Sequence, residues 1–390
     1  MRQALEGSQA VARAVALCRP EVVAAYPITP QTHIVESISK LVADGELETE
    51  LISVESEFSA ASVVLGAAAA GSRSYTASSS QGILLMSEVL FNIAGLRVPL
   101  VLTCANRAVS APLSIWNDHQ DSMAVRDAGW IQLYCANNQE VVDTTIQAYR
   151  ISETTEIPVM VCMDGFVLTH TVEVIDMPSA EQVDSYLPPY RFSRVLDPAK
   201  PISVGTLVGP DHYTEVRHSH HQAVVKSIKH IVSADRDWRK ISGRSAGGLM
   251  SIEGPKDAKT AILSLGSVVG TLRDAMDAFP QRRKVKLINL RCFRPFPIDA
   301  LRKACRGLDD LIVLERAVSP GVGGILGAEV RAALFGQAKA PSVHNFAAGL
   351  GGRDVPLDFY PRLLKAVGNG SSDGFSILDV ELDKLPREDR

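Results

Sequence analysis

The sequence predicts an α/β protein built around parallel β-sheets. In roughly the first 165 residues, short apolar runs alternate with longer segments of helical periodicity. Strand-then-helix alternation is typical of a parallel sheet whose two faces are covered by helices. The apolar runs are continuous, which is the pattern of strands that are buried on both sides. The same alternation returns beyond Asp257 and predicts a second, smaller α/β unit.

The first unit contains six expected strands, with helices between them. The expected strands are Glu21–Ala25, Glu50–Val54, Arg73–Ala77, Val98–Cys104, Ile131–Tyr134 and Ile157–Cys162. The expected helices are Gln31–Val42, Ser56–Ala70, Gly82–Ala94 and Gln139–Glu153.

A change of composition separates the two units. Five prolines gather between Asp176 and Pro201, and a polar helical stretch follows at Asp211–Arg239. The second unit is expected to have the strands Thr260–Leu265, Val285–Leu290 and Leu311–Glu315, with helices that begin at Val268, Asp299 and Gly324. We therefore predict a first domain at residues 1–195, a connector with a helix at 196–256, and a second domain at 257–390.

Composition and charge exclude several classes of protein. The 390 residues carry a formal net charge of −4 with no long run of one sign, which gives no support to a nucleic-acid-binding surface. The most apolar stretches are shorter than the ~18 residues that a membrane span needs. The N-terminus carries Glu6 and Arg13 where a signal peptide would be apolar. We therefore expect a cytoplasmic protein that binds neither nucleic acid nor a membrane.

The six cysteines are spaced too widely in the sequence to suggest a metal site. No two of them show the spacing C-x-x-C or a similar one. Iron–sulfur clusters usually need grouped thiolates, so none is expected in this chain. His218, His220 and His221 gather in the polar helical stretch, but without a further ligand nearby they are interpreted as a solvated helix face. The sequence thus predicts no metal ligands.

Polar side chains follow the expected strands of the first unit, where ligands of open α/β sheets bind. Thr29 lies on a loop with two prolines, and Arg107 follows the fourth strand. The planar fork of an arginine pairs with carboxylates, so this edge is expected to bind a small organic acid. Glu55 and Glu57 lie where a strand ends and a helix begins. Glu57 either faces a bound cofactor or only stabilises the helix start, where an anion is worth about 0.3–1 kcal/mol.

Five ordered motifs resemble one known family. They are Y-P-I-T-P-Q-T (Tyr26–Thr32), V-E-S-E-x-S-A (Val54–Ala60), S-S-Q-G (Ser79–Gly82), N-R-A (Asn106–Ala108) and W-N-D-H-x-D-S-M (Trp116–Met123). Together they are similar to the alpha subunit of the 2-oxoacid:ferredoxin oxidoreductases, of the pyruvate:ferredoxin oxidoreductase (pyruvate synthase) type. The resemblance continues through D-G-F-x-L-T-H (Asp164–His170) into the second unit and covers nearly the whole chain.

The resemblance implies an enzyme that is divided over several chains. The first domain would be a thiamine-diphosphate-binding domain of the pyrimidine type, and the second would resemble the C-terminal domain of transketolase. Thiamine diphosphate would be shared with a beta subunit that holds its diphosphate and Mg²⁺, and the lack of a G-D-G motif here agrees with this. A gamma subunit, a delta subunit with [4Fe-4S] clusters, and ferredoxin or a flavoprotein are the other implied partners. The substrates would be a small 2-oxo acid and coenzyme A.

The resemblance also assigns roles to individual residues. Glu57 would bind the ring nitrogen of the aminopyrimidine and assist the proton transfer that activates the cofactor. Arg107 would pair with the carboxylate of the substrate, and Thr29 would hydrogen-bond to it from the opposite loop. Asp118 and His119 lie on a loop at the same edge of the sheet, and from this position they are expected to contact the cofactor or the partner chain.

Three alternatives remain open. Phe58 stands where pyruvate-using relatives commonly have histidine; it either packs in the core or favours a bulkier acid such as phenylglyoxylate, with NAD as the final acceptor. Gly321–Gly327 resembles a dinucleotide fingerprint, but its third glycine is displaced, so a tight turn and close helix packing are the favoured interpretation. The chain could also be a non-catalytic assembly subunit.

Overall fold

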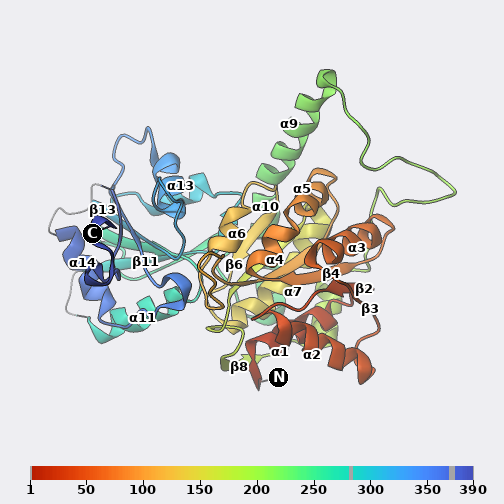
Figure 1. The fold of residues 1–390 in the computed structure, drawn as a ribbon, viewed down its shortest axis with the longest axis horizontal. Coiled ribbons are helices and arrows are strands. Elements are labelled where there is room, and N and C mark those ends of the chain that lie inside the picture. Colours follow the sequence, from red (N-terminus) through yellow and green to blue (C-terminus); the bar gives the residue numbers. More distant parts are fainter. Residues whose placement is uncertain (1, 281–283, 369–373, 390) are drawn as a thin grey trace.

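The computed structural model describes residues 2–280, 284–368 and 374–389. The chain forms two lobes, and each is built around its own β-sheet (Figure 1). The first lobe is coloured mainly red to green in Figure 1 and the second cyan to blue. The predicted α/β fold with parallel sheets is confirmed.

The first sheet has the strand order β12-β6-β7-β5-β4-β2-β3. All neighbouring pairs are parallel except the one that involves β12. The strands are β2 (Val22–Ala25), β3 (Glu50–Ser53), β4 (Ser74–Ser78), β5 (Val101–Asn106), β6 (Ile131–Tyr134), β7 (Val159–Asp164) and β12 (Cys292–Arg294). Every strand that we expected in this unit is present, with its ends shifted by at most a few residues.

Helices cover both faces of this sheet, and an apolar core fills each side. One core includes residues of α1 (Gly7–Leu17), α2 (Thr32–Ala43), α7 (Asn138–Thr155), α8 (Ala180–Tyr186) and α10 (Ile228–Ser242). The other includes residues of α3 (Glu57–Ala69), α4 (Ser80–Leu85) and α5 (Ser87–Gly95). The helix expected at Gly82–Ala94 is therefore two helices, because the backbone of Met86 leaves the helical region between them.

A two-stranded antiparallel ribbon lies beside the first sheet. It pairs β1 (Arg2–Glu6) with β8 (Val172–Asp176), with Arg2 opposite Asp176 and Glu6 opposite Val172. Neither strand of the ribbon was predicted from the sequence, and helix α1 was not predicted either. The ribbon fixes the start of the chain next to the segment that follows β7.

The second sheet has the order β15-β14-β13-β10-β11-β9, and only β9 runs antiparallel to its neighbour. Its strands are β9 (Met250–Glu253), β10 (Thr260–Ser264), β11 (Val285–Leu290), β13 (Asp310–Glu315), β14 (Ser342–Ala347) and β15 (Phe375–Ile377). The helices of this lobe are α11 (Val268–Ala278), α12 (Ile298–Ala304), α13 (Ile325–Leu334) and α14 (Phe359–Gly368), with short 3-10 turns at Leu350–Gly352, Leu382–Lys384 and Arg387–Asp389. The expected strands and helix starts of this unit are confirmed.

Strand β12 joins the two lobes, because it comes from the second half of the chain and pairs with β6 of the first sheet. The buried Arg291 next to it donates from Nη2 to Thr144 Oγ1 at 3.1 Å and Gln147 Oε1 at 2.9 Å, both on α7. Strand β9 lies within the expected connector and belongs to the second sheet. The limits 1–195, 196–256 and 257–390 stay a prediction.

The polar helical stretch is two helices, α9 (Pro210–Lys226) and α10, which meet at Ser227. Helix α9 projects from the first lobe together with the loop that precedes it (green in Figure 1). His218 and His221 are exposed, as expected. The expectation is wrong for His220, which is buried because its ring packs on Gly129, where an added Cβ would lie 2.3 Å from Cε1. No helix in the described part of the chain is both long and apolar enough to cross a membrane.

Candidate active site

The candidate site lies at the carboxyl ends of the first sheet, where the strand order reverses. The chain passes from β2 to β3 on one side and then returns to β4 on the other side of β2. Ligands of open α/β sheets bind at such a switch point. Thr29 follows β2, Glu57 follows β3, Gly82 follows β4 and Arg107 follows β5, so the expected residues do start from this edge.

Glu57 is a buried carboxylate that has no partner among the residues the structure describes. It is the first residue of α3, and its side chain is 7% exposed. The Ser56 hydroxyl caps the helix by accepting a hydrogen bond from Ser59 N at 3.2 Å. Glu57 itself forms no hydrogen bond or ion pair with any residue that the structure describes. Burying an unpaired carboxylate is costly, so its burial points to a partner from outside this chain.

Gly82 leaves room for the Glu57 carboxylate. A Cβ at position 82 would lie 2.6 Å from Glu57 Oε1 and 2.4 Å from Ser78 Oγ. The Ser78 hydroxyl is also buried without a hydrogen-bond partner among the described residues. The Glu57 carboxylate and the Ser78 hydroxyl, which both lack a partner among the described residues, therefore lie next to Gly82 near the start of α4.

The structure brings Arg107 and Thr29 together. Arg107 is 6% exposed and donates from Nη1 to the carbonyl oxygen of Thr29 at 2.8 Å and from Nε to the carbonyl oxygen of Ser114 at 2.9 Å. Its Nη2 has no partner among the described residues. Burial lowers the pKa of Arg107, and the charge of Asp121 partly offsets this effect. Thr29 takes part through its carbonyl group rather than its hydroxyl, and its side chain is exposed.

A buried aspartate that we did not predict as a site residue organises this edge. Asp121 Oδ2 accepts hydrogen bonds from Ser80 N and from Arg107 N, both at 2.9 Å, and Oδ1 accepts from Asn106 Nδ2 at 2.8 Å. One carboxylate thus fixes the start of α4, which carries Gly82, relative to the backbone of Arg107. Burial raises the pKa of Asp121. The motif W-N-D-H-x-D-S-M contains this residue, and its second aspartate was the available signal.

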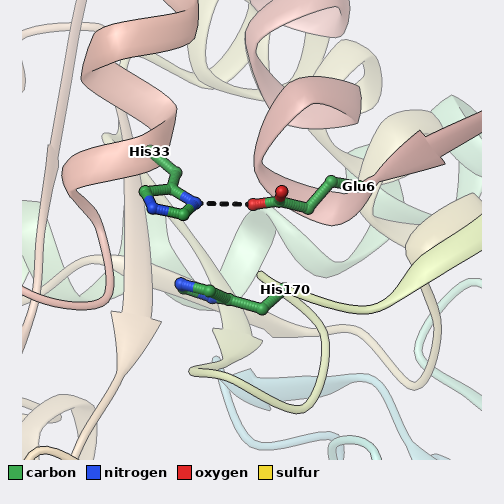
Figure 2. Close-up of side chains that lie close together, drawn as sticks. All are labelled: Glu6, His33 and His170. Carbon is green, nitrogen blue, oxygen red and sulfur yellow. Dashed lines mark hydrogen bonds and ion pairs between the residues drawn. The ribbon is translucent and has the colours of Figure 1, made fainter.

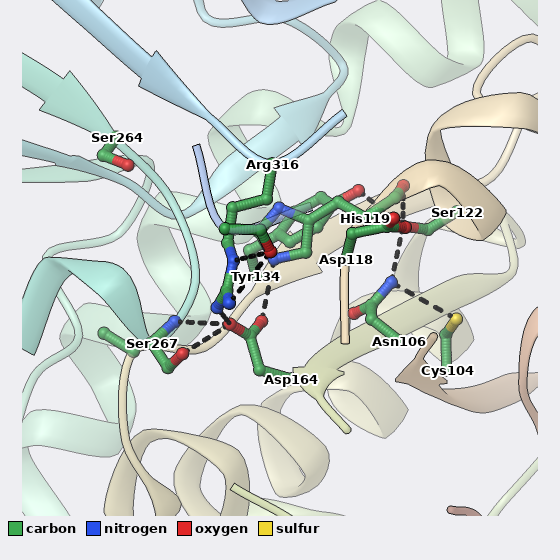
Figure 3. Close-up of polar contacts among 12 residues, drawn as sticks. Cys104, Asn106, Asp118, His119, Ser122, Tyr134, Asp164, Ser264, Ser267 and Arg316 are labelled. Carbon is green, nitrogen blue, oxygen red and sulfur yellow. Dashed lines mark hydrogen bonds and ion pairs between the residues drawn. The ribbon is translucent and has the colours of Figure 1, made fainter. Parts of the chain in front are cut away.

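His119 lies at the junction of the lobes. Its Nε2 lies 2.8 Å from Asp164 Oδ1, at the end of β7 (Figure 3). Asp164 Oδ2 also accepts hydrogen bonds from Ser267 N at 3.1 Å and from Arg316 Nη1 at 3.3 Å, both in the second lobe. Burial alone would raise the pKa of Asp164, but His119, Arg316 and Ser267 outweigh it and hold that pKa well below its ordinary value.

Asp118 contacts the second lobe as well. Its Oδ1 accepts from Gln120 N at 3.0 Å, and its Oδ2 accepts from Gly351 N at 3.2 Å. Burial raises the pKa of Asp118 to about 6, against the hydrogen bonds that lower it. These hydrogen bonds of Asp118 and His119 are formed within the chain, and the role of the two residues toward a cofactor or a partner stays a prediction.

The raised pKa of Asp118 makes stability depend on pH. A carboxyl group with a folded pKa near 6 and an ordinary pKa of 3.8 stabilises the fold below about pH 4 and loses that contribution as the pH rises through 6. We expect Asp118→Asn to gain roughly 1–3 kcal/mol of unfolding free energy relative to the parent chain between pH 4 and pH 7. Urea unfolding at several pH values measures this. The exposed Asp127→Asn is the control, and a pH-independent difference for Asp118→Asn would contradict the expectation.

The glycine run of the second lobe does not form an open phosphate site. The Glu315 carboxylate accepts hydrogen bonds from Leu326 N at 2.8 Å and Gly327 N at 2.9 Å, at the start of α13. A Cβ at Gly324 would lie 2.1 Å from Glu315 Oε1. The helix start is therefore occupied by a carboxylate of the chain, as the interpretation of close packing anticipated.

The parallel sheet with helices on both faces and a switch point at its carboxyl edge defines the class of doubly wound α/β proteins. Residues 13–236 match the family model of the thiamine diphosphate-binding part of the pyruvate flavodoxin/ferredoxin oxidoreductases, and residues 258–358 match core domain II of pyruvate:ferredoxin oxidoreductase. The chain belongs to this family. The resemblance found in the motifs is thereby confirmed.

Several curated relatives are similar over nearly their whole length. The pyruvate synthase subunit PorA of Methanosarcina barkeri is 42% identical, over 96% of this chain and 94% of the relative. That of Methanothermobacter thermautotrophicus is 46% identical, over 90% and 91%. The ketoisovalerate oxidoreductase subunit VorA of Pyrococcus abyssi is 39% identical, over 92% and 91%.

A solved structure supports the fold. The 2-oxoglutarate:ferredoxin oxidoreductase from Magnetococcus marinus superposes with a TM-score of 0.74 at 21% identity, over 94% of this chain and 65% of that chain. A split-gene transketolase matches with a TM-score of 0.54 at 12% identity. The predicted thiamine-diphosphate-binding fold with a second, smaller α/β lobe is confirmed.

Proposed function

We propose that this chain is the alpha subunit of a complex that oxidatively decarboxylates a 2-oxo acid, with pyruvate as the favoured substrate, to an acyl-CoA and passes the electrons to ferredoxin. The family and the pyruvate synthase relatives support the reaction class. The buried and unpaired Glu57 beside Gly82 is the observation that carries the proposal, because it gives a specific place for the cofactor.

Thiamine diphosphate fits the residues of this site. Two buried polar groups, Glu57 and Ser78, have no partner within the described ranges, and Gly82 leaves room for both side chains. When bound, the cofactor supplies a nucleophilic carbon and an electron sink for the loss of carbon dioxide. Glu57 would hold a proton between one of its carboxylate oxygens and a ring nitrogen of the cofactor, at a buried position.

Arg107 and Thr29 bind the acid. Two of the guanidinium donors hold the loops that carry Thr29 and Ser114, which fixes the plane of the fork. Nη2 remains for the substrate carboxylate, and a charge-assisted hydrogen bond at a buried site is among the strong ones. The exposed Thr29 hydroxyl lies on the loop whose carbonyl Arg107 already holds, and it adds a second hydrogen bond to the acid.

Other subunits complete the enzyme in this proposal. A beta subunit provides the diphosphate site with Mg²⁺, and a gamma and a delta subunit are present, the delta subunit with [4Fe-4S] clusters. Ferredoxin, or a flavoprotein in its place, accepts the electrons. Support for partner chains comes from the relatives, which are named as subunits.

The size of the 2-oxo acid is the open choice within this reaction. Phe58 is 38% exposed and does not pack in the core, so it can border a ligand. The relatives reported above are named for pyruvate, ketoisovalerate and 2-oxoglutarate, and none for phenylglyoxylate or NAD. We therefore place pyruvate first and a branched 2-oxo acid second.

The test is an assay of the purified complex. Reduction of a viologen dye is measured with pyruvate, 2-oxoisovalerate or phenylglyoxylate, each with and without coenzyme A. We expect the highest kcat/KM with pyruvate and a requirement for coenzyme A in sustained turnover. A complex that reduces the dye with none of these acids contradicts the proposal.

Arg107→Ala is expected to raise the KM for pyruvate by roughly 10- to 100-fold, because a hydrogen bond between charged groups is worth about 1.5–3 kcal/mol. The KM for coenzyme A should stay the same. Arg236→Ala, which removes an exposed arginine of α10, is the matched control. An unchanged KM for pyruvate in Arg107→Ala would favour an assembly subunit without a catalytic role.

A further inference from the structure

Three potential metal ligands from distant parts of the chain meet outside the candidate active site (Figure 2). Glu6 lies at the end of β1, His33 in the first turn of α2 and His170 in the segment between β7 and β8. One ligand atom of each residue lies within 4.8 Å of those of the other two. We propose that Glu6, His33 and His170 form a binding site for a divalent cation of the first transition-metal row, with Zn²⁺ as the representative ion.

The donor set has the chemistry of such a site. Two imidazoles and one carboxylate suit Zn²⁺ and its neighbours rather than Mg²⁺ or Ca²⁺, which prefer oxygen ligands. His33 Nδ1 and Glu6 Oε1 are already 2.8 Å apart and share a proton in a hydrogen bond. In the proposed site a cation replaces this proton, because the lone pairs of His33 Nδ1 and Glu6 Oε1 both point to the position between the two atoms.

His170 is held in position by its neighbours. Its Nδ1 lies 2.7 Å from Thr169 Oγ1, which also accepts a hydrogen bond from Phe166 N at 2.8 Å. The ring stacks on Phe166 at a centroid distance of 4.8 Å and on His33 at 4.4 Å. With Nδ1 engaged, Nε2 is the nitrogen that is left for a metal. A hydrogen bond to the other ring nitrogen commonly orients a metal-binding histidine.

The ligands need only a small movement to close around an ion. Zinc bonds of about 2.0–2.2 Å place tetrahedral ligands about 3.3–3.5 Å apart. The ligand atoms lie within 4.8 Å of one another, so no pair has to approach by much more than about 1 Å. His33 can supply this movement, because 47% of its side chain is exposed and its hydrogen-bond partner Glu6 is itself a member of the proposed site. All three ligands are only partly buried, so water would complete the coordination.

A cation here would connect three segments around the Thr29–Pro30 loop. Gly165 packs against that loop, since an added Cβ would lie 2.6 Å from Pro30 Cγ. Helix α2, with His33, begins at Thr32. The site includes neither Glu57 nor Arg107, so its existence does not depend on the proposed function. The consequence is a fold whose stability near the acid-binding loop rises with the concentration of the metal.

The test uses the full-length chain without a purification tag, alone and in its complex. Titration calorimetry with ZnCl₂ should give one strong site per chain, and the thermal midpoint should rise with Zn²⁺ because the ion binds only the folded state. His33→Ala, His170→Ala and Glu6→Gln should each weaken binding by at least tenfold and remove the rise. Co²⁺ bound in place of Zn²⁺ should give the visible absorption of a low-coordinate site.

The control is His212→Ala, which removes an exposed histidine of α9 and should leave both readouts unchanged. Absence of binding to the parent chain, binding that survives His170→Ala, or an equal loss in His212→Ala would each overturn the proposal. Circular dichroism checks the folding of each variant. Glu6→Gln keeps the shape of its side chain and decides the matter where a histidine variant does not fold.

Discussion

Glu57→Gln is expected to lower the turnover of the complex by about 10²- to 10⁴-fold, the usual contribution of a group that transfers a proton in the rate-determining chemistry. Glutamine fills the same space next to Gly82, where a Cβ would already come within 2.6 Å of the Glu57 carboxylate. It cannot hold a proton on the atom that faces the cofactor. Viologen reduction at saturating pyruvate measures the loss.

The same substitution should not weaken the fold. Glu57 is buried without a partner among the described residues, and a neutral amide is cheaper to bury than a charge. The thermal midpoint of Glu57→Gln should therefore equal or exceed that of the parent chain. Glu55→Gln, two residues away and exposed, is the matched control and should keep full turnover. Full turnover in Glu57→Gln would remove the role that we propose for this residue.

Asp164→Ala is expected to destabilise the protein by about 3–5 kcal/mol, the range found when one member of a buried ion pair is removed. The substitution leaves His119 Nε2, the Ser267 amide and the Arg316 guanidinium without their acceptor in a buried place. Arg316 would keep its hydrogen bonds to the carbonyl oxygen of Gly349 but lose its counter-charge. The midpoint of urea unfolding measures the effect.

The pH dependence gives this prediction a second readout. Because the pKa of Asp164 is lowered in the folded state, its ionised form stabilises the fold above the ordinary pKa near 4, and this stability is lost as the pH falls further. The parent chain and Asp164→Ala should therefore converge in stability in strong acid. Asp237→Ala, at an exposed ion pair, should cost less than about 1 kcal/mol. A cost for Asp164→Ala as small as that would contradict the expectation.

The alternation of strands and helices could be predicted from the sequence because the spacing of apolar residues within each element reflects which of its faces are buried. The runs Ile131–Tyr134 and Val285–Leu290 coincide with β6 and β11. The gathering of Thr29, Glu57 and Arg107 at one edge follows from the same pattern, since loops at the carboxyl ends of parallel strands must meet there. The part of the site that could be predicted is thus the part that depends on topology.

What could not be predicted depends on partners far away in the chain. Strands β1 and β8 are short and exist as a pair that joins Arg2 to Asp176. Asp121 and Asp164 look like ordinary acids in the sequence, and only the fold shows which donors surround them. His33 and His170 are 137 positions apart, and no local window contains both.

Strand β12 has a consequence for engineering with this chain. A gene cut after residue 256 would leave β6 with a bare row of amide and carbonyl groups, and unprotected edges of this kind promote aggregation. A chimera that takes its C-terminal half from a relative would also import the outermost strand of the N-terminal sheet. Such grafts should match residues 291–294 to the recipient, or carry the recipient's own segment across the junction.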